Sequence, residues 1–233
     1  MKKIIIPLIL LICNISFSQK TITVEGWNNI KESAENMESD SLILKGTNYS
    51  FRAFFPEESE IMNKVVIIYF TETINRKYKL EYSYLYRGSA KYNLNDFIGA
   101  IKDFNEQIVL NPKDSKAHQM RALSKIGLED YYGGIIDLSK AINNFNKESG
   151  KSYLSSLFNE RARCYLLLKK DPKALIDLNK AIELDNENSL SYELRGLYYL
   201  YNKFKEKACL DWSKSGELGN TKAYDYIRKY CND

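Results

Sequence analysis

The sequence predicts an all-α solenoid of about four tandem helical hairpins closed by a C-terminal capping helix. An arginine and an aspartate sixteen residues apart recur four times along the chain. A glycine or alanine follows each arginine, and an apolar stripe of helical spacing follows in turn. Sequence that repeats in this way forms stacked units that pack on their neighbours. The pairs are Arg87 with Asp103, Arg121 with Asp137, Arg161 with Asp177, and Arg195 with Asp211.

We place the repeat array at residues 81–219. The first hairpin covers residues 81–114, and its second helix ends at Asn111 because Pro112 cannot continue it. The second hairpin, 115–148, follows at a spacing of 34 residues. Six extra residues, 147–152, precede the third hairpin at 155–188, and the fourth begins at residue 189.

Small residues recur where the two helices of a hairpin must approach each other. On the first helix they are Gly88, Ala122, Ala162 and Gly196. On the second helix they are Ala100, Gly134, Ala174 and Ala208. The large residues expected to fill the space between hairpins are Phe104, Leu138, Leu178 and Trp212.

This period and pattern resemble the tetratricopeptide repeat, in the variant whose first helix carries Arg-Gly or Arg-Ala. The resemblance covers residues 81 to about 221, and two positions depart from it: Gly134 stands where alanine is usual, and Phe204 comes one place early. The resemblance implies a right-handed superhelix whose first helices line a concave groove. The C-terminal sequence is also similar to the end of exported bacterial proteins of this family.

The last residues, 220–233, predict the capping helix. Ala223, Tyr226, Ile227 and Tyr230 recur at helical spacing after Gly219. A solenoid leaves an apolar face on its last hairpin, which such a helix would cover.

Three cysteines follow the N-terminal segment, and two of them flank the last turn. Cys209 and Cys231 lie nine residues before Leu218 and twelve after Gly219, an offset of about 4.5 Å along two antiparallel helices. We expect a disulfide between them, with two small buried thiols as the alternative. Cys164 is interpreted as a packing residue.

We interpret residues 1–18 as a secretory signal peptide. Two lysines precede an apolar run, and small residues follow it, so we expect cleavage after Ser18 and a periplasmic or secreted protein. Acylation at Cys13 is the first alternative, although Ile12 stands where lipoprotein signals need a small residue. An uncleaved anchor is the second. No further apolar stretch reaches bilayer length, so we expect no transmembrane segment after cleavage.

Residues 19–80 form an extension with no clear repeat. Residues 61–74 predict a buried helix, the second helix of a degenerate leading repeat whose first helix would cover 48–55. A strand over 65–70 is the alternative, because this run is rich in β-branched and aromatic residues. Residues 27–37 predict an amphipathic helix capping the N-terminal end.

Several function classes find no support in the sequence. The charge after cleavage is about +2, from +4 for the whole chain, and no basic cluster marks a nucleic-acid surface. His118 is the sole histidine, so we expect no histidine metal cluster, and no glycine-rich phosphate loop is present. We therefore expect no catalytic residues and no cofactor or metal.

The resemblance carries a partner-binding groove onto the first helices of this chain. Its expected members are Tyr82, Leu85, Tyr92, Gln119, Asn159, Arg163, Leu197 and Tyr201. The family's clamp for a peptide's terminal carboxylate is absent, because its positions carry Leu85, Ser89, Met120, Ser156 and Glu160.

We interpret the arginine–aspartate pairs as structural ion pairs, with charged ligand contacts as the alternative. The expected function is a non-catalytic adaptor that holds a peptide or partner helix in the groove. A structural subunit of an envelope assembly and a small-ligand or glycan-binding module are the alternatives.

Overall fold

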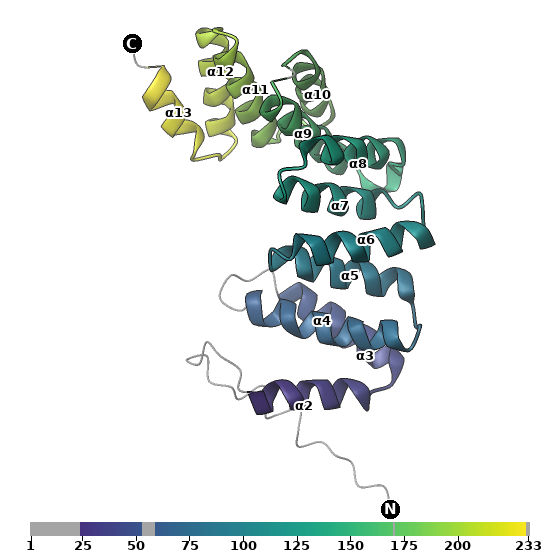
Figure 1. Ribbon diagram of the computed structural model, residues 1–233. Helices are drawn as coiled ribbons and strands as arrows, with labels where there is room; N and C mark the ends of the chain where they lie inside the picture. Colours follow the sequence, from purple (N-terminus) through teal and green to yellow (C-terminus); the bar gives the residue numbers. More distant parts are fainter. Residues whose placement is uncertain (1–23, 53–58, 170, 232–233) are drawn as a thin grey trace, which may run out of the picture. The chain divides into compact units, whose positions relative to one another are not determined.

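The computed structural model describes residues 24–52, 59–169 and 171–231. This part of the chain holds twelve α-helices and one 3-10 turn, and it contains no strand (Figure 1). The predicted all-α class is confirmed. The predicted signal peptide and Cys13 lie outside the described residues. No helix in the described ranges is both long and apolar enough to cross a bilayer.

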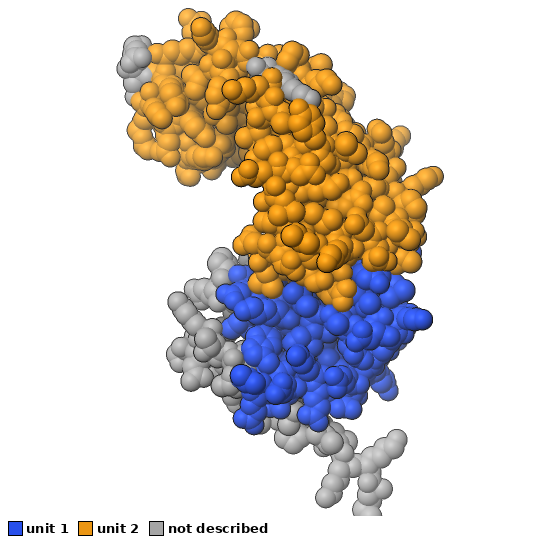
Figure 2. All heavy atoms as spheres, in the orientation of Figure 1, with its two compact units in different colours: residues 1–86 blue, residues 87–233 orange. Residues whose placement is uncertain are grey.

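The chain divides into two compact units, residues 1–86 and 87–233 (Figure 2), and the boundary falls within residues 80–93, which form helix α5. Unit 1 holds α2 (Val24–Glu35), α3 (Ser39–Arg52), α4 (Ser59–Asn75) and the first half of α5 (Leu80–Asn93). In unit 2 the second half of α5 is followed by α6 (Phe97–Leu110), α7 (Ser115–Gly127), α8 (Tyr131–Asn143), the 3-10 turn η1 (Lys147–Ser149), α9 (Lys151–Leu167), α10 (Asp171–Leu184), α11 (Ser189–Tyr201), α12 (Lys205–Glu217) and α13 (Ala223–Tyr230).

In unit 1, α3 and α4 form a hairpin, and α2 packs against α4. The Arg76 side chain at the end of α4 donates hydrogen bonds to the carbonyl oxygens of Ala34, at 3.1 Å, and Glu35, at 2.6 Å. These carbonyls lie in the last turn of α2, where the helix itself offers them no donor. One guanidinium therefore fixes the end of α2 on α4.

Two expectations for this region need correction. The run at 65–70 lies inside α4 and is not a strand. The first helix of the leading hairpin begins at Ser39, well before the predicted start at residue 48. The reason is the spacing of its close contact: Gly46 meets Phe70 from 24 residues away, whereas Gly88 meets Phe104 from 16. Eight additional residues between the contact positions shift the first helix toward the N-terminus.

In unit 2 the hairpins are closed by one kind of contact between a small residue on the first helix and a large one on the second. A Cβ added at Gly88 would lie 2.8 Å from the Phe104 ring, and one at Gly196 would lie 2.4 Å from the Trp212 indole. The two middle hairpins use alanine against leucine in their cores, Ala122 with Leu138 and Ala162 with Leu178. All four large side chains are fully buried.

The second helices of the first two hairpins, α6 and α8, begin with the same local signals. The side chains of Asp96 and Asp130 accept hydrogen bonds from the backbone N–H of Gly99 and Gly133, at 2.9 and 2.8 Å. Such N-caps satisfy donors that the first helical turn leaves unpaired. The residue before each cap, Asn95 or Glu129, has positive φ, which reverses the chain between the two helices.

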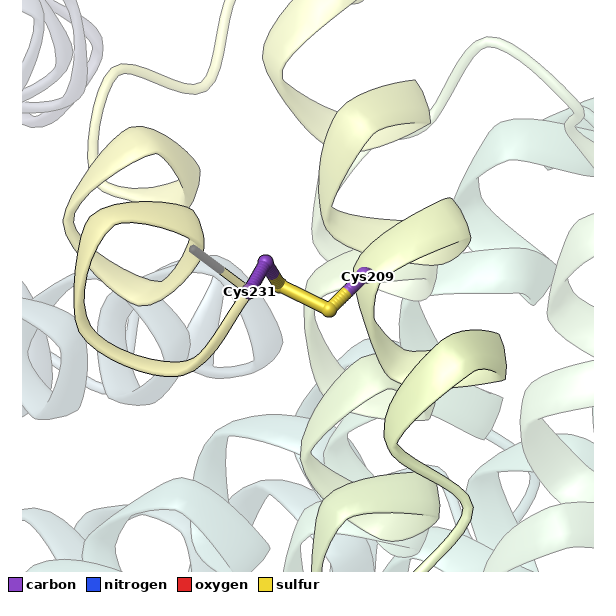
Figure 3. Close-up of a disulfide and its surroundings, with 2 residues drawn as sticks. All are labelled: Cys209 and Cys231. Atoms are coloured by element: carbon purple, nitrogen blue, oxygen red, sulfur yellow. A yellow bond between two sulfur atoms is a disulfide. The ribbon is translucent and has the colours of Figure 1, made fainter. Parts of the chain in front are cut away.

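The array ends with α13 lying over the last hairpin. Trp212 stacks on the Tyr226 ring with centroids 5.0 Å apart, and Ala223 is buried beside it. Cys209 of α12 and Cys231 form a disulfide with Cα atoms 5.9 Å apart (Figure 3). The aromatic stack and the covalent bond together fix the helix that covers the end of unit 2.

Candidate functional site

The arginine–aspartate pairs are two-pronged, partly buried ion pairs between the two helices of each hairpin. In every pair Nε and Nη2 of the arginine each donate to one carboxylate oxygen, over distances of 2.5 to 3.0 Å. The aspartates are at most 7% exposed. A guanidinium fork matched to a carboxylate is among the stronger polar contacts in proteins. The pairs thus hold the two helices of a hairpin at a fixed distance.

Three of these arginines also reach the preceding hairpin. Arg121 donates to the Asn105 amide oxygen at 2.7 Å, and Arg195 donates to that of Asn179 at 2.9 Å. Arg161 lies 3.0 Å from the Ser139 hydroxyl. These acceptors come two residues after the previous hairpin's aspartate, a regularity that the sequence analysis did not use. Each of these three arginines therefore ties three helices together and has little capacity left for an external ligand.

Within the described residues, the first two pairs have a further cation that the last two lack. Lys91 and Lys125 lie 2.8 Å from the carboxylates of Asp103 and Asp137. Burial disfavours the charged carboxylate of Asp137, but the basic side chains around it outweigh burial, and its pKa is well below the ordinary value. Tyrosine takes the place of this lysine in the last two hairpins.

The predicted groove residues Tyr92 and Arg163 lie within electrostatic range of each other in unit 2. Tyr92 lies near the end of α5, and its pKa is raised by burial and by the carboxylate of Glu160 on α9, with Arg163 opposing the shift. Arg163 forms an ion pair with Glu160 over 2.6 Å, and its side chain remains 45% exposed. This aromatic ring and accessible guanidinium, on first helices separated by α7, form what we call the groove patch: Tyr92, Glu160 and Arg163.

Two further exposed side chains, Leu167 and Tyr201, lie at the ends of first helices in unit 2. Leu167 ends α9 and Tyr201 ends α11, at the equivalent position 34 residues later, and both are exposed. Leu197 is only partly buried and packs between the core clusters of the last hairpins. Of these three, Tyr201 and Leu167 can contact a ligand directly, and Leu197 mainly supports them.

Two predicted groove residues are buried, and one of them contacts a neighbouring helix. Asn159 is 1% exposed, because its amide nitrogen donates to the Ser191 hydroxyl of α11 at 2.8 Å. Gln119 is 7% exposed and accepts a hydrogen bond from the Lys116 ammonium at 3.0 Å. Their expected place on the binding surface is therefore wrong. Both act in packing between helices or in holding a neighbouring side chain.

The two remaining predicted groove residues belong to unit 1. Tyr82 is 56% exposed and stacks on Tyr86, which in turn stacks on Phe70. Leu85 is half-buried on the same helix. Tyr82 thus presents an accessible ring supported by two further aromatic rings.

The described residues contain no cluster of three histidine, cysteine or acidic side chains able to hold a metal ion. His118 is buried and contacts the Pro112 carbonyl oxygen at 3.0 Å through Nε2. Burial raises the pKa of the Cys164 thiol to about 12, which leaves it protonated and unreactive.

Comparison with solved structures identifies the architecture. The 41-to-end form of MamA from Desulfovibrio magneticus superposes with a TM-score of 0.62 at 17% identity, over 76% of this chain and 94% of that one. The fold is a tetratricopeptide-repeat solenoid. A chain of the APC/C hetero-tetramer Cut9-Hcn1 gives a TM-score of 0.68 at 17% identity, over 89% of this chain and 40% of that one. YrrB, described as a TPR protein with an unusual peptide-binding site, gives 0.55 at 16% identity, over 70% and 85%.

Sequence relatives support the same tetratricopeptide assignment. The Hsp70-Hsp90 organising protein of Plasmodium falciparum is 27% identical over 143 residues, which are 61% of this chain and 25% of that protein. The tetratricopeptide repeat protein 36 homolog of Drosophila melanogaster is 30% identical over 96 residues, 39% of this chain and 52% of that protein. The chain thus spans from a quarter to about half of the length of these relatives. No protein-family model matches it.

Proposed function

We propose that this protein is a non-catalytic adaptor, acting in the periplasm or outside the cell, that holds a peptide or partner helix on the first helices of its repeats. The observation that carries the proposal is the groove patch. Its accessible guanidinium and half-buried tyrosine ring are presented together, while the repeated arginines are engaged inside the scaffold. The scaffold and the binding surface thus use different arginines.

The chemistry of this surface fits an extended segment with mixed character. Tyr92 and Tyr201 offer rings with a polar hydroxyl, and Leu167 offers an apolar contact. Either member of the Arg163–Glu160 ion pair can leave the other and bind a charged group of the ligand. YrrB, which shares the fold, is described as having a peptide-binding site. Since the family's carboxylate clamp is absent here, we expect recognition of an internal segment of the partner.

Export is part of the proposal and rests on residues 1–18, with the lysines and apolar run typical of a signal peptide. The disulfide between Cys209 and Cys231 is consistent with an oxidising compartment. Fractionation of cells producing the full chain tests the location. A protein of full length that stays in the cytoplasm would contradict it.

The binding test is capture from native envelope extract by the chain lacking residues 1–18. The test variant carries Tyr92→Ala and Arg163→Ala. A matched control is Arg228→Ala, since Arg228 also pairs with an acidic residue three positions away on an exposed helix face. The proposal expects a protein that the parent and the control capture and the test variant loses. Capture by all three would remove the groove patch from the binding surface.

A second candidate function is assembly through the second helices. Residues immediately before three of the paired aspartates form a row of exposed apolar side chains: Ile136 on α8, Ile176 on α10 and Leu210 on α12. Such a row on an exposed face marks a surface that can associate with another chain. This function predicts that Ile176→Glu/Leu210→Glu abolishes capture, whereas the groove variant keeps it.

A further inference from the structure

A cavity of about 540 Å³ opens in unit 2 where the second and third hairpins meet. The turn after α6, the start of α7, the end of α8, the turn η1 and the first turn of α9 all contribute to it. Its lining residues are Asn111, Lys113, Asp114, Ser115, Lys116, Asn144, Asn146, Ser149 and Tyr153. None of them belongs to the groove patch.

The insertion in the sequence builds one wall of this cavity. Residues 147–152 are the six extra residues between the second and third hairpins, and they contain the turn that carries Ser149. The Asn146 side chain caps this turn by accepting a hydrogen bond from the Glu148 backbone N–H at 3.1 Å. The other connections between consecutive hairpins of the array keep the 34-residue period and have no such segment.

The net charge of the cavity lining is positive, because it contains Lys113 and Lys116 against the single carboxylate of Asp114. Lys116 has its pKa lowered by burial, with Asp114 opposing the shift, and its ammonium lies 5.7 Å from the centre of the Tyr153 ring. Its hydrogen-bond acceptor is the neutral Gln119. The Asp114 carboxylate is already occupied by the Ala117 N–H, at 3.0 Å, and the Gln107 amide, at 2.8 Å. A partly desolvated ammonium without a carboxylate at ion-pair distance favours an anionic ligand.

Apart from Lys113, the rest of the lining is neutral and rich in hydrogen-bonding groups. The side chains of Asn111 and Ser149 make no hydrogen bond within the described residues, and Asn144 makes only a long one of 3.4 Å to the Pro112 carbonyl. The Tyr153 ring supplies an apolar group; Phe145 stacks on it with ring centroids 6.4 Å apart, and its hydroxyl lies 3.2 Å from the Ser115 hydroxyl. A bare inorganic anion would use the ammonium and leave most of these groups unused.

We propose that this cavity binds an acidic saccharide, a sugar ring that carries a carboxylate or a sulfate. Lys116 and Lys113 pair with the acidic group, the carboxamides and Ser149 hydrogen-bond to ring hydroxyls, and the Tyr153 ring lies against the apolar face of the sugar. The volume is within the range of small-ligand sites. This site is independent of the groove, and it remains if the adaptor function is wrong.

Isothermal titration of the chain lacking residues 1–18 with four probes tests the proposal. Glucuronate and glucose 6-sulfate are the two acidic sugars, glucose is the neutral sugar, and inorganic sulfate is the bare anion. We expect saturable binding of at least one acidic sugar, with glucose and sulfate each at least tenfold weaker. The acidic sugar that binds more tightly shows whether the cavity prefers a carboxylate or a sulfate group.

Three variants test whether the acidic sugar binds in this cavity. Lys116→Gln should weaken binding of the acidic sugar at least tenfold. Lys173→Gln should not, although Lys173 lies over the Tyr165 ring at a comparable 5.8 Å outside the cavity. Asn111→Ala/Asn144→Ala should reduce the preference for the sugar over sulfate. Equal binding of sulfate and the acidic sugars, no binding of either acidic sugar, or full binding by a folded Lys116→Gln variant would each overturn the proposal.

Discussion

The hairpin of α3 and α4 in unit 1 and the hairpins of unit 2 share one contact and differ in another. Gly46 lies against Phe70 as Gly88 lies against Phe104, each with 2.8 Å from the position of a Cβ to the ring. Within the described residues of unit 1, the ion pair of unit 2 has no counterpart at the equivalent positions. Lys45 precedes Gly46 where arginine precedes Gly88, and Tyr69 stands where Asp103 would be. The close contact is therefore the general feature, and the ion pair is an addition to it.

In the place of the aspartate, unit 1 uses aromatic packing. Tyr69 is 2% exposed and stacks on Tyr49 with ring centroids 5.7 Å apart. Burial raises the pKa of its phenol to about 12, so it stays neutral. A charged carboxylate in this position would need a cation to offset its desolvation. Unit 1 thus replaces a polar link between helices by an apolar one.

The size of the small residue follows the size of the large one. Glycine stands opposite the aromatic residues Phe70, Phe104 and Trp212, as a Cβ there would lie within 3.0 Å of the ring. Alanine stands opposite Leu138 and Leu178. A smaller residue opposite a larger one fills the space without overlap, which is expected of an interior packed at high density.

The largest expected effect comes from removing the large residue. Phe70→Ala should destabilise unit 1, and Phe104→Ala should destabilise unit 2, each by about 3–5 kcal/mol, because both rings are fully buried. Urea unfolding followed by tryptophan fluorescence measures the two losses separately when either Trp212 or Trp27 is replaced by phenylalanine, because the remaining tryptophan then reports on unit 1 or on unit 2. A loss for Phe104→Ala alone would show that the leading hairpin does not depend on this contact.

The disulfide should contribute less, about 3 kcal/mol in the chain-entropy model for a loop of this length. Reduction, or Cys209→Ser/Cys231→Ser, should lower the stability of unit 2 and leave unit 1 unchanged, because the bond restrains α13 alone. The double variant should no longer respond to reductant. A response equal to that of the parent would place the sensitive group elsewhere.

The match in size between the small and the large residue predicts a smaller loss of stability, which a second substitution should partly restore. Gly88→Ala should destabilise unit 2 by about 1–3 kcal/mol, since overpacking against Phe104 outweighs the gain in helix propensity. Gly88→Ala/Phe104→Leu recreates the alanine–leucine pair of the middle hairpins and should recover part of the loss. Thermal unfolding of both variants measures this. A double variant less stable than Phe104→Leu alone would contradict this match.

The smallest effect is a dependence on pH. The pKa of Asp137 is lowered in the folded protein, so its stabilising contribution is fully present above the ordinary aspartate pKa of about 3.9 and is lost as the pH falls below that value. Asp137→Asn should therefore flatten the fall in stability of unit 2 between about pH 5 and pH 2. Urea midpoints of parent and variant across this range provide the comparison. Parallel curves would show that other groups cause the fall.

The sequence predicted the array because its pairs repeat in register over 34 residues, and local signals such as Pro112 fixed the helix ends. It misplaced α3, since eight additional residues broke the period on which the prediction relied. Position in the repeat also failed to separate Arg163, which is exposed, from Asn159, which faces α11. The cavity depends on how the inserted residues fold back, and the repeat pattern contains no information about that.

Two arginines on one helix give the most direct test that scaffold and binding surface are separate. Arg161 is tied to Asp177 and Ser139, whereas among the described residues Arg163 pairs only with Glu160, three positions away. The measurement is the melting temperature together with partner capture for Arg161→Ala and Arg163→Ala. We expect Arg161→Ala to melt at lower temperature but still capture the partner, and Arg163→Ala to melt like the parent and lose it. The reverse assignment, or equal effects of both changes, would contradict the account.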